Sequence, residues 1–428
     1  MTSLPNRLRG WDASGSWDRF TEVRESLSLE WVEGIWRSAH RGRRRGCGAR
    51  RRGAGDAIVF ASSDRIEPDA EAELGDADLR CESTASVAGR YLAQVRESAA
   101  TEARSPVHLS AVGHLYRQRI LHETAGRRAE DMRSGAWLEM RAWVPGSGIP
   151  VHLVRADETL EDLIHRMGPA EAGRVLGERC RDQLGEREAV RVHGEVLPAV
   201  FAAGGCEALA HEIGHLFEGE ASGTIAEPWK AGDRIAPAMV TLMDDPSAKV
   251  PGRGRYRVDD EGALPRSVTL IERGRVAHRI EAGSLEDASA SSSRLGHGRR
   301  ASFRDLPQAR MACTIFEAGA DDPREIVAHT RRGIFVRRLG TGSMDPASGR
   351  VTLSVTEGWL IENGSLTHPI APSFLVSDVA SLLDAIDAVG SDLTYDHGAT
   401  NCVRAFQQLP VIVGQPTIRI GLIKVISP

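Results

Sequence analysis

The chain has 428 residues, of which 41% are hydrophobic and 26% are charged. These proportions match ordinary globular proteins, and they exclude a disordered chain, a collagen-like repeat and a small disulfide scaffold. The net charge of −5 argues against a general nucleic-acid binder, because phosphate contacts require a basic face. We therefore expect no nucleic-acid partner.

Membrane and targeting signals are not visible in the sequence. The longest apolar stretches, such as Phe374–Leu383, are broken by Ser and Asp well short of the ~18 residues that a membrane span needs. The first residues contain no apolar segment typical of a secretory signal. We expect a cytoplasmic protein without a membrane partner.

One local exception to the acidic balance is the run RGRRRGCGARRR, from Arg41 to Arg52. Only three of the 54 basic residues are lysines, which indicates biased codon usage and weakens an arginine cluster as a sign of nucleic-acid binding. We interpret the run as a charged turn between two strands, with nucleic-acid binding as the weaker alternative. No lysine follows a glycine, which excludes a P-loop, and the six cysteines form no CxxC pair.

The first half of the chain predicts a mixture of strands and helices. Residues 46–63 are typical of two strands around a glycine-rich turn, and 88–103 have apolar residues at helical spacing. Residues 107–154 alternate as short strands. Residues 157–186 predict two helices that separate at Gly168–Pro169, with Asp157 as the N-cap of the first.

A boundary near Pro198–Gly205 divides the chain into an N-terminal α/β region, 1–197, and a C-terminal domain, 198–428. The segment CEALAHEIGHLFEGE predicts a helix that stops at Gly219, and the chain beyond it is rich in β patterns. Hairpins are expected at Gly274 and at Asn363–Gly364, a helix over residues 373–389 and strands at the end. The fold class is therefore α+β, with a mainly antiparallel, β-rich second half that carries the helix of the HEIGH motif.

The motif HEIGH, from His211 to His215, is the sharpest chemical signal. Positions i and i+4 share one face of a helix, so both imidazoles can bind one metal ion from the same side. Glu212 can then take a proton from a water molecule that the metal activates. Gly214 supports a functional interpretation, since glycine costs roughly 1 kcal/mol inside a helix.

A catalytic zinc site needs a third protein ligand and an open position. The residues after His215 lack the third histidine of the metzincins, which excludes that class. A downstream glutamate, with Glu218 and Glu227 as candidates, or a distant cysteine could complete the site. The spacing leaves these alternatives open.

Five segments in order resemble the C-terminal catalytic region of the TldD/PmbA metallopeptidases: HEIGHLFEGE, GDRIAPAMVTLMDDP, GHGRRASFRDLPQARM, WLIENGSL and CVRAFQQLPVIVGQPTIRI. The resemblance covers roughly residues 200–428 and is thin before them. It is nearer to the TldD branch, which carries the metal motif, than to the PmbA (TldE) branch, which lacks it.

The resemblance implies that Cys402 is the third ligand of a zinc ion, Zn2+, beside His211 and His215, with Glu212 as general base. It also implies an unfolded or leader-type peptide substrate, which enters a closed cleft between two subunits as an extended strand. The partner would be a second copy of the chain or a paralogous PmbA/TldE-like subunit.

Three departures from the family pattern stand out. The two histidines are four residues apart rather than five, and on a helix this places them about 40° apart instead of about 140°. Val403 and Phe406 replace glycines, which predicts a narrower mouth of the site. The N-terminal part matches poorly, which puts the peptide cleft of the family in doubt.

Two functions follow from the sequence. The first is a zinc-dependent peptidase that hydrolyses unfolded or leader-type peptides, for example in the processing of a peptide precursor. The alternative is a catalytically impaired, metal-binding partner subunit of a heteromeric complex of the TldD/PmbA type. An intact Glu212 favours the first, because a structural metal site does not need that carboxylate.

Overall fold

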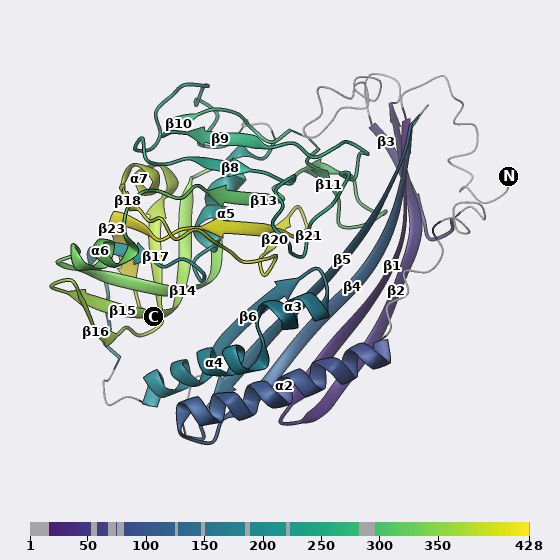
Figure 1. Cartoon of the computed structure of the whole chain (residues 1–428). Helices are drawn as coiled ribbons and strands as arrows, with labels where there is room; N and C mark the ends of the chain where they lie inside the picture. Colours follow the sequence, from purple (N-terminus) through teal and green to yellow (C-terminus); the bar gives the residue numbers. More distant parts are fainter. Residues whose placement is uncertain are drawn as a thin grey trace.

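The computed structural model describes residues 17–52, 58–66, 74, 81–124, 127–146, 150–184, 189–219, 223–281 and 296–427. The N-terminal half forms a six-stranded antiparallel sheet in the order β3-β2-β1-β4-β5-β6. Its strands are β1 (Trp17–Val32), β2 (Ile35–Arg52), β3 (Ile58–Ser63), β4 (His108–Thr124), β5 (Arg127–Trp143) and β6 (Val151–Asp157). Figure 1 shows β1, β2, β4 and β5 as long, curved ribbons beside the C-terminal half.

Three helices pack on one end of this sheet: α2 (Cys81–Ala103), α3 (Leu160–Arg166) and α4 (Pro169–Leu184). Leu92 and Val95 of α2 are fully buried and share a core with Leu109 of β4 and Met140 of β5. The predicted helix over 88–103 and the division at Gly168–Pro169 are confirmed. The predicted N-cap is wrong: Thr159 caps α3 by accepting the Asp162 N–H at 3.1 Å. The carboxylate of Asp157 accepts instead from the Arg166 side chain at 2.7 Å.

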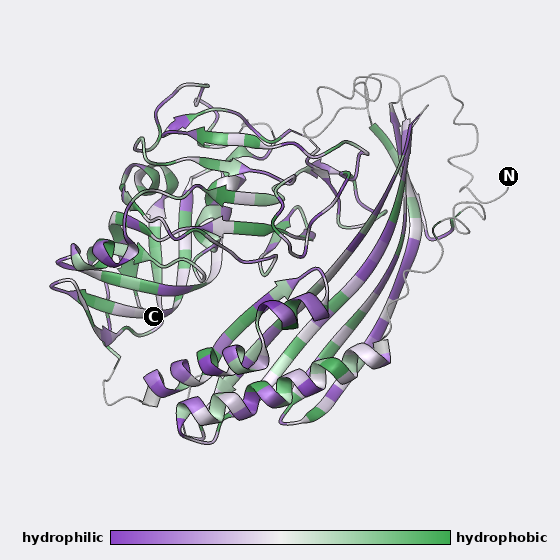
Figure 2. Cartoon of the chain, viewed as in Figure 1, coloured by the Kyte–Doolittle hydropathy of each residue, from purple (hydrophilic) through white to green (hydrophobic). Residues whose placement is uncertain are grey.

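The region 107–154 forms strands much longer than the short pieces expected from its pattern, since β4 and β5 each have 17 residues. The arginine-rich run also lies inside a strand, β2, and the expected turn at this place is wrong. Its arginines form ion pairs with acidic residues of β1, among them Arg44 with Glu22 at 2.8 Å. The paired strand supplies the opposite charge that makes an arginine-rich strand stable here. Figure 2 shows mostly hydrophilic residues at the end of the long sheet where β3 lies.

The C-terminal half contains two large sheets around one core. The first consists of β7 (Val196–Phe201), β14 (Arg332–Met344), β15 (Arg350–Glu362), β16 (Ser365–Pro369), β17 (Ser373–Asp378), β18 (Ile386–Val389) and β23 (Ile418–Ile426). Because β14 pairs with both β7 and β15, this sheet closes on itself. The second consists of β8 (Leu242–Asp244), β9 (Val268–Glu272), β10 (Arg275–Val276), β13 (Cys313–Phe316), β19 (Thr394–Tyr395) and β22 (Ile412–Gln415).

The smaller elements of this half are β11 (Gly298–Arg299), β12 (Gln308–Ala309), β20 (Asn401–Arg404), β21 (Gln407–Pro410), α6 (Pro323–Ala328) and α7 (Val379–Asp384). The predicted hairpins at Gly274 and Asn363–Gly364 and the terminal strands are confirmed. The single helix expected over 373–389 is wrong, because Asp378 ends β17 and caps α7 by accepting the Ser381 N–H at 2.8 Å. The fold class, α+β with a mainly antiparallel second half, is confirmed.

The short helix α5 (Ala208–Gly214) lies between the two C-terminal sheets and carries the HEIGH motif. Its apolar residues Leu209, Ala210 and Ile213 are fully buried in the core that both sheets share. The helix ends earlier than predicted: residues 215–217 form a 3-10 turn, and Gly219 follows it. Gly214 has a packing reason, since a Cβ there would lie 2.2 Å from the Met311 Sδ.

Candidate metal centre

His211 and His215 lie on one face of α5 and of the turn that follows it, as the spacing predicts. Their ring centroids are 4.6 Å apart and the rings meet edge to face. The shortened motif therefore brings both imidazoles together, with His215 at the start of the 3-10 turn that follows α5. His211 is 4% exposed, and its Nδ1 has no hydrogen-bond partner among the described residues.

Cys402 reaches the histidines from β20, 187 residues further along the chain. Its Sγ lies 3.7 Å from the Nε2 of His215, and the donor atoms of His211, His215 and Cys402 all lie within 4.8 Å of one another. Donors of a tetrahedral zinc ion, at bond lengths of 2.0–2.3 Å, stand about 3.3–3.8 Å apart. Two imidazoles and a thiol at this spacing thus fit a zinc ion with little adjustment.

The electrostatics of the three side chains also suit a cation. Burial alone would raise the pKa of the Cys402 thiol, but hydrogen bonds from His211 and His215 and their charges lower it to about 5. A thiolate at neutral pH is the form that binds metals. Arg310 also donates to Cys402 Sγ at 3.0 Å.

Glu218 orients His215 rather than joining the three donors. One carboxylate oxygen accepts from the Nδ1 of His215 at 2.7 Å, and the other accepts from the Met311 N–H at 2.7 Å. Burial alone would raise the pKa of Glu218, but His215, Arg310 and Arg404 lower it to about 2. A carboxylate on the far nitrogen of a metal-binding histidine fixes its tautomer and direction. Sequence reasoning considered Glu218 only as a ligand, although the segment GHLFEG already places it three residues after His215.

The other glutamate considered as a ligand, Glu227, is exposed and accepts a hydrogen bond from the Gly223 N–H at 3.1 Å. It is not in the group of donors that the structure brings together among the described residues. Cys206 and Cys313 are buried in the core, away from that group.

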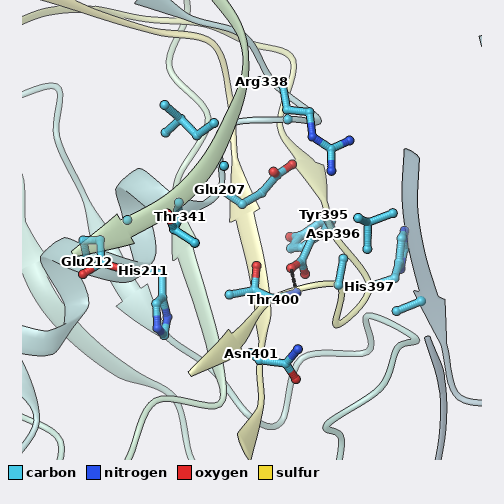
Figure 3. A pocket seen from close by; sticks show the side chains of 18 of the residues that line it. Glu207, His211, Glu212, Arg338, Thr341, Tyr395, Asp396, His397, Thr400 and Asn401 are labelled. Carbon is cyan, nitrogen blue, oxygen red and sulfur yellow. Dashed lines mark hydrogen bonds between the residues drawn. The ribbon is translucent and has the colours of Figure 1, made fainter. Parts of the chain in front are cut away.

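Glu212 lines the same cavity as the two histidines, and Figure 3 shows it near His211. It is 8% exposed, and burial raises the pKa of its carboxyl group. Gly342 of β14 leaves the space for it: a Cβ at 342 would lie 2.7 Å from the Glu212 Cγ and 2.8 Å from its Oε1. Sequence reasoning missed this glycine, because nothing in the pattern of β14 marks its contact with α5.

The central cavity has a volume of about 1120 Å³ and lies between the two halves of the chain. The N-terminal sheet and α3 contribute one wall, with residues such as Trp137, His152 and Arg155, and the C-terminal half contributes α5, β14 and the segment 394–404. Of the two residues expected to narrow the mouth of the site, Val403 lines the cavity. Phe406 is fully exposed and is not among the lining residues.

The comparisons with known proteins agree on one family. The family described as PmbA/TldA metallopeptidase C-terminal domain matches residues 194–427. A metalloprotease TldD homolog of Haemophilus influenzae is 31% identical over 58% of this chain and 52% of its own length. A zinc metalloprotease TldD homolog of Saccharolobus solfataricus is 24% identical over 53% of this chain and 51% of its own. The matched segment thus spans about half the length of these curated relatives.

The likeness in fold extends further than the likeness in sequence. The crystal structure of TldE from Thermococcus kodakarensis superposes with a TM-score of 0.70 and 18% identity, and it covers 96% of both chains. The poorly matched N-terminal half therefore shares the fold of that protein as well. Among the described residues, no helix is both long enough and apolar enough to cross a membrane. Because the family match over residues 194–427 covers more than half of the chain, the chain belongs to the PmbA/TldD metallopeptidase family.

Proposed function

We propose that this chain is a zinc-dependent peptidase that hydrolyses unfolded or leader-type peptides, with a role in the processing of peptide precursors. The observation that carries the proposal is the meeting of three metal donors, His211, His215 and Cys402, in a cavity that also contains the carboxylate of Glu212. The names of the curated relatives, metalloproteases and in one case a zinc metalloprotease, support it.

The donor set favours zinc among the divalent metals. Two imidazoles and a thiolate are the borderline-soft ligands that zinc prefers, and three protein ligands leave a fourth position open for the reaction. Zinc, when bound, would polarise the scissile carbonyl and lower the pKa of a water molecule. The buried Glu218 would hold His215 in the tautomer whose Nε2 is free to bind.

Glu212 would serve as the general base. Its carboxylate follows His211 directly and shares the cavity, so it can accept a proton from the attacking water and deliver it to the leaving amine. Burial raises the pKa of Glu212, and a base whose pKa lies nearer to neutral returns the proton more readily.

An open strand edge beside Glu212 suits an extended peptide. β14 pairs with β7 only over Ile334–Val336, and beyond Leu339 its ladder partner among the described residues is β15 alone. The segment Gly340–Met344 lines the central cavity. A peptide could therefore add to this edge through main-chain hydrogen bonds, which bind without strong selection of side chains.

We further propose that the working form is a dimer, with a second copy of the chain or with a paralogous subunit of the PmbA/TldE type. The alternative function, a catalytically impaired metal-binding subunit of such a complex, differs in its outcome: it predicts bound zinc without hydrolysis by this chain.

The test combines metal content by mass spectrometry with hydrolysis of an unfolded peptide. Wild type should hold about one zinc ion per chain and cleave the peptide in a chelator-sensitive way. Cys402→Ala should lose the metal, whereas Glu212→Ala should retain it and lose hydrolysis. A wild type that binds no stoichiometric metal, or a Cys402→Ala variant that binds as well as wild type, contradicts the ligand assignment. If the chain binds zinc but does not hydrolyse the peptide, either alone or with a paralogous subunit added, the proposed peptidase function is contradicted.

A further inference from the structure

Two arginines of the central cavity stand without an acidic partner. Arg155, on β6, and Arg338, on β14, both line the cavity, and neither forms an ion pair with a carboxylate among the described residues. Arg155 uses its Nε and Nη1 on the Met167 Sδ and the Val154 carbonyl. Arg338 uses its Nη1 on the His152 carbonyl at 3.0 Å. Each guanidinium therefore keeps donors that no described group accepts.

The other charged groups of the cavity are already engaged. Arg166 is paired with Asp157, Arg404 with Glu218, and Glu139 with Arg141 and His152. The carboxylate of Asp396 accepts from the backbone N–H groups of Gly398, Thr400 and Val413. Among the described lining residues, these contacts leave Arg155 and Arg338 as arginines without an ion pair that can bind a ligand.

Holding two such cations together is unfavourable without an anion. Burial lowers the pKa of Arg155, and repulsion by Arg338 lowers it further. Both side chains are half-buried, and arginines are the groups that bind a carboxylate through parallel N–H donors.

Glu207 is the carboxylate whose charge acts on both arginines, but it is not paired with either of them. It lies one helical turn before His211 and faces the same cavity, and Figure 3 shows it between His211 and Arg338. It forms no ion pair with either arginine among the described residues. Burial and the charge of Asp396 raise the pKa of Glu207 to about 7, although Arg155 and Arg338 act to lower it.

We infer that Arg155 and Arg338 form an anion subsite that binds a carboxylate of the peptide substrate. This inference rests on the proposed peptidase function and adds a substrate class to it. The subsite lies beyond Glu207, which is itself one helical turn, about 5.4 Å, from His211, so at least roughly two residues of extended chain would separate the metal donors from the bound carboxylate. The bound carboxylate is therefore either the C-terminus of a peptide cut close to its end or an Asp or Glu side chain near the scissile bond.

Binding to the full-length, zinc-loaded Glu212→Gln protein tests the inference without hydrolysis. The probes are two pairs of fluorescent decapeptides with one unstructured sequence. The members of the first pair differ at the C-terminus, which is a free carboxylate in one and a carboxamide in the other. The members of the second pair both end in a carboxamide and differ at one internal position, which is Glu in one and Gln in the other. In one of the two pairs, we expect the peptide with the carboxylate to bind about tenfold more tightly than its neutral counterpart. The pair in which this difference appears shows whether the subsite binds the C-terminus or an acidic side chain. Arg338→Gln and Arg155→Gln, each added to the Glu212→Gln protein, should abolish this advantage, whereas Arg338→Lys should retain part of it.

Arg337→Gln provides the matched control. Arg337 is the neighbour of Arg338, but it faces away from the central cavity, pairs with Asp182 at 3.1 Å and stacks on Trp359. The Arg337→Gln variant should therefore retain the preference for the carboxylate peptide. The subsite is overturned if both members of each pair bind equally, or if neither carboxylate peptide binds. It is also overturned if the preference for the carboxylate persists in Arg338→Gln and Arg155→Gln. Binding is measured separately from cleavage. If the carboxylate preference is present but wild type does not hydrolyse the peptides, the result would contradict the proposed peptidase function and not the subsite.

Discussion

Glu218 lies three residues after His215 and contacts its Nδ1, so it would act on the proposed zinc site by orienting His215. Both carboxylate oxygens accept from N–H groups, one from His215 and the other from Met311. Glu218→Gln would turn an amide NH2 group against one of these donors, and we expect zinc affinity to fall about 10- to 100-fold. Competition with a chelator measures it. Glu227→Gln, on an exposed side chain, is the control, and equal affinities of the two variants would contradict this role.

Gly342 leaves space for the side chain of Glu212, the proposed general base. Gly342→Ala would press a methyl group onto the Glu212 side chain, because the new Cβ would lie 2.7 Å from its Cγ. We expect peptide hydrolysis to fall by about tenfold or more while zinc content stays unchanged, since misplaced catalytic groups lose rate steeply. The control is Gly168→Ala, whose Cβ would meet open space. Loss of zinc in Gly342→Ala would point to a general disturbance of α5.

Two hairpins show which turns could be predicted from the sequence and which could not. Asn363–Gly364 has the residues that a two-residue turn with positive φ requires, with φ of 50° and 76°. Ala405 and Phe406 adopt the same positive values, 47° and 61°, in the hairpin that carries Cys402, but nothing in their chemistry announces a turn. Local preference is overruled there by the ladder between β20 and β21. The helix expected over 373–389 fails for a related reason, because its apolar residues are buried against different neighbours in β17, α7 and β18.

The hairpin of β20 and β21 holds two residues other than glycine, Ala405 and Phe406, at positive φ. A residue other than glycine with positive φ costs roughly 1–2 kcal/mol, and the Phe406 side chain is fully exposed, so it recovers no burial within the chain. We expect Ala405→Asn with Phe406→Gly to raise the free energy of unfolding by about 1 kcal/mol, after the entropy cost of glycine. Urea unfolding of the zinc-free protein, at one protein concentration, measures it. A loss of stability would show that Phe406 makes contacts outside its own chain.

The candidate metal centre is predictable only in part, because it joins parts of the chain that are far apart. His211 and His215 follow from helical spacing, which is local. Cys402, 187 residues beyond His215, was assigned only through the resemblance to a family, since no periodicity links β20 to α5. The wall that the N-terminal sheet contributes to the cavity, with Arg155 on β6, left no signal in the sequence at all.

The two halves of the molecule are also held together by buried charge. Arg50 of β2 lies between Asp18 of β1, at 2.6 Å, and Glu261 of the C-terminal half, and all three side chains are nearly inaccessible to solvent. Arg50→Met would leave two buried carboxylates without this cation, and we expect a loss of about 3–5 kcal/mol in unfolding free energy at pH 7. Arg41→Met is the control, because Arg41 is 60% exposed in its pair with Glu25 and should cost less than about 1 kcal/mol.

The pH dependence of that loss distinguishes an ion pair from simple packing. Burial alone would raise the pKa of Asp18, but the nearby His122, whose Nε2 lies 3.8 Å from Asp18 Oδ2, and the charges of Arg50 and Arg300 hold it well below its ordinary value of 3.8. A carboxyl group with a lowered pKa in the folded state stabilises the protein above its unfolded pKa, and this contribution disappears as the pH falls through the folded value. In Arg50→Met part of that lowering is absent, so the gap in unfolding free energy between wild type and variant should narrow from pH 7 toward pH 3. Urea unfolding at both pH values measures the gap, and a gap of constant size would mean that Arg50 joins the halves by packing rather than by charge.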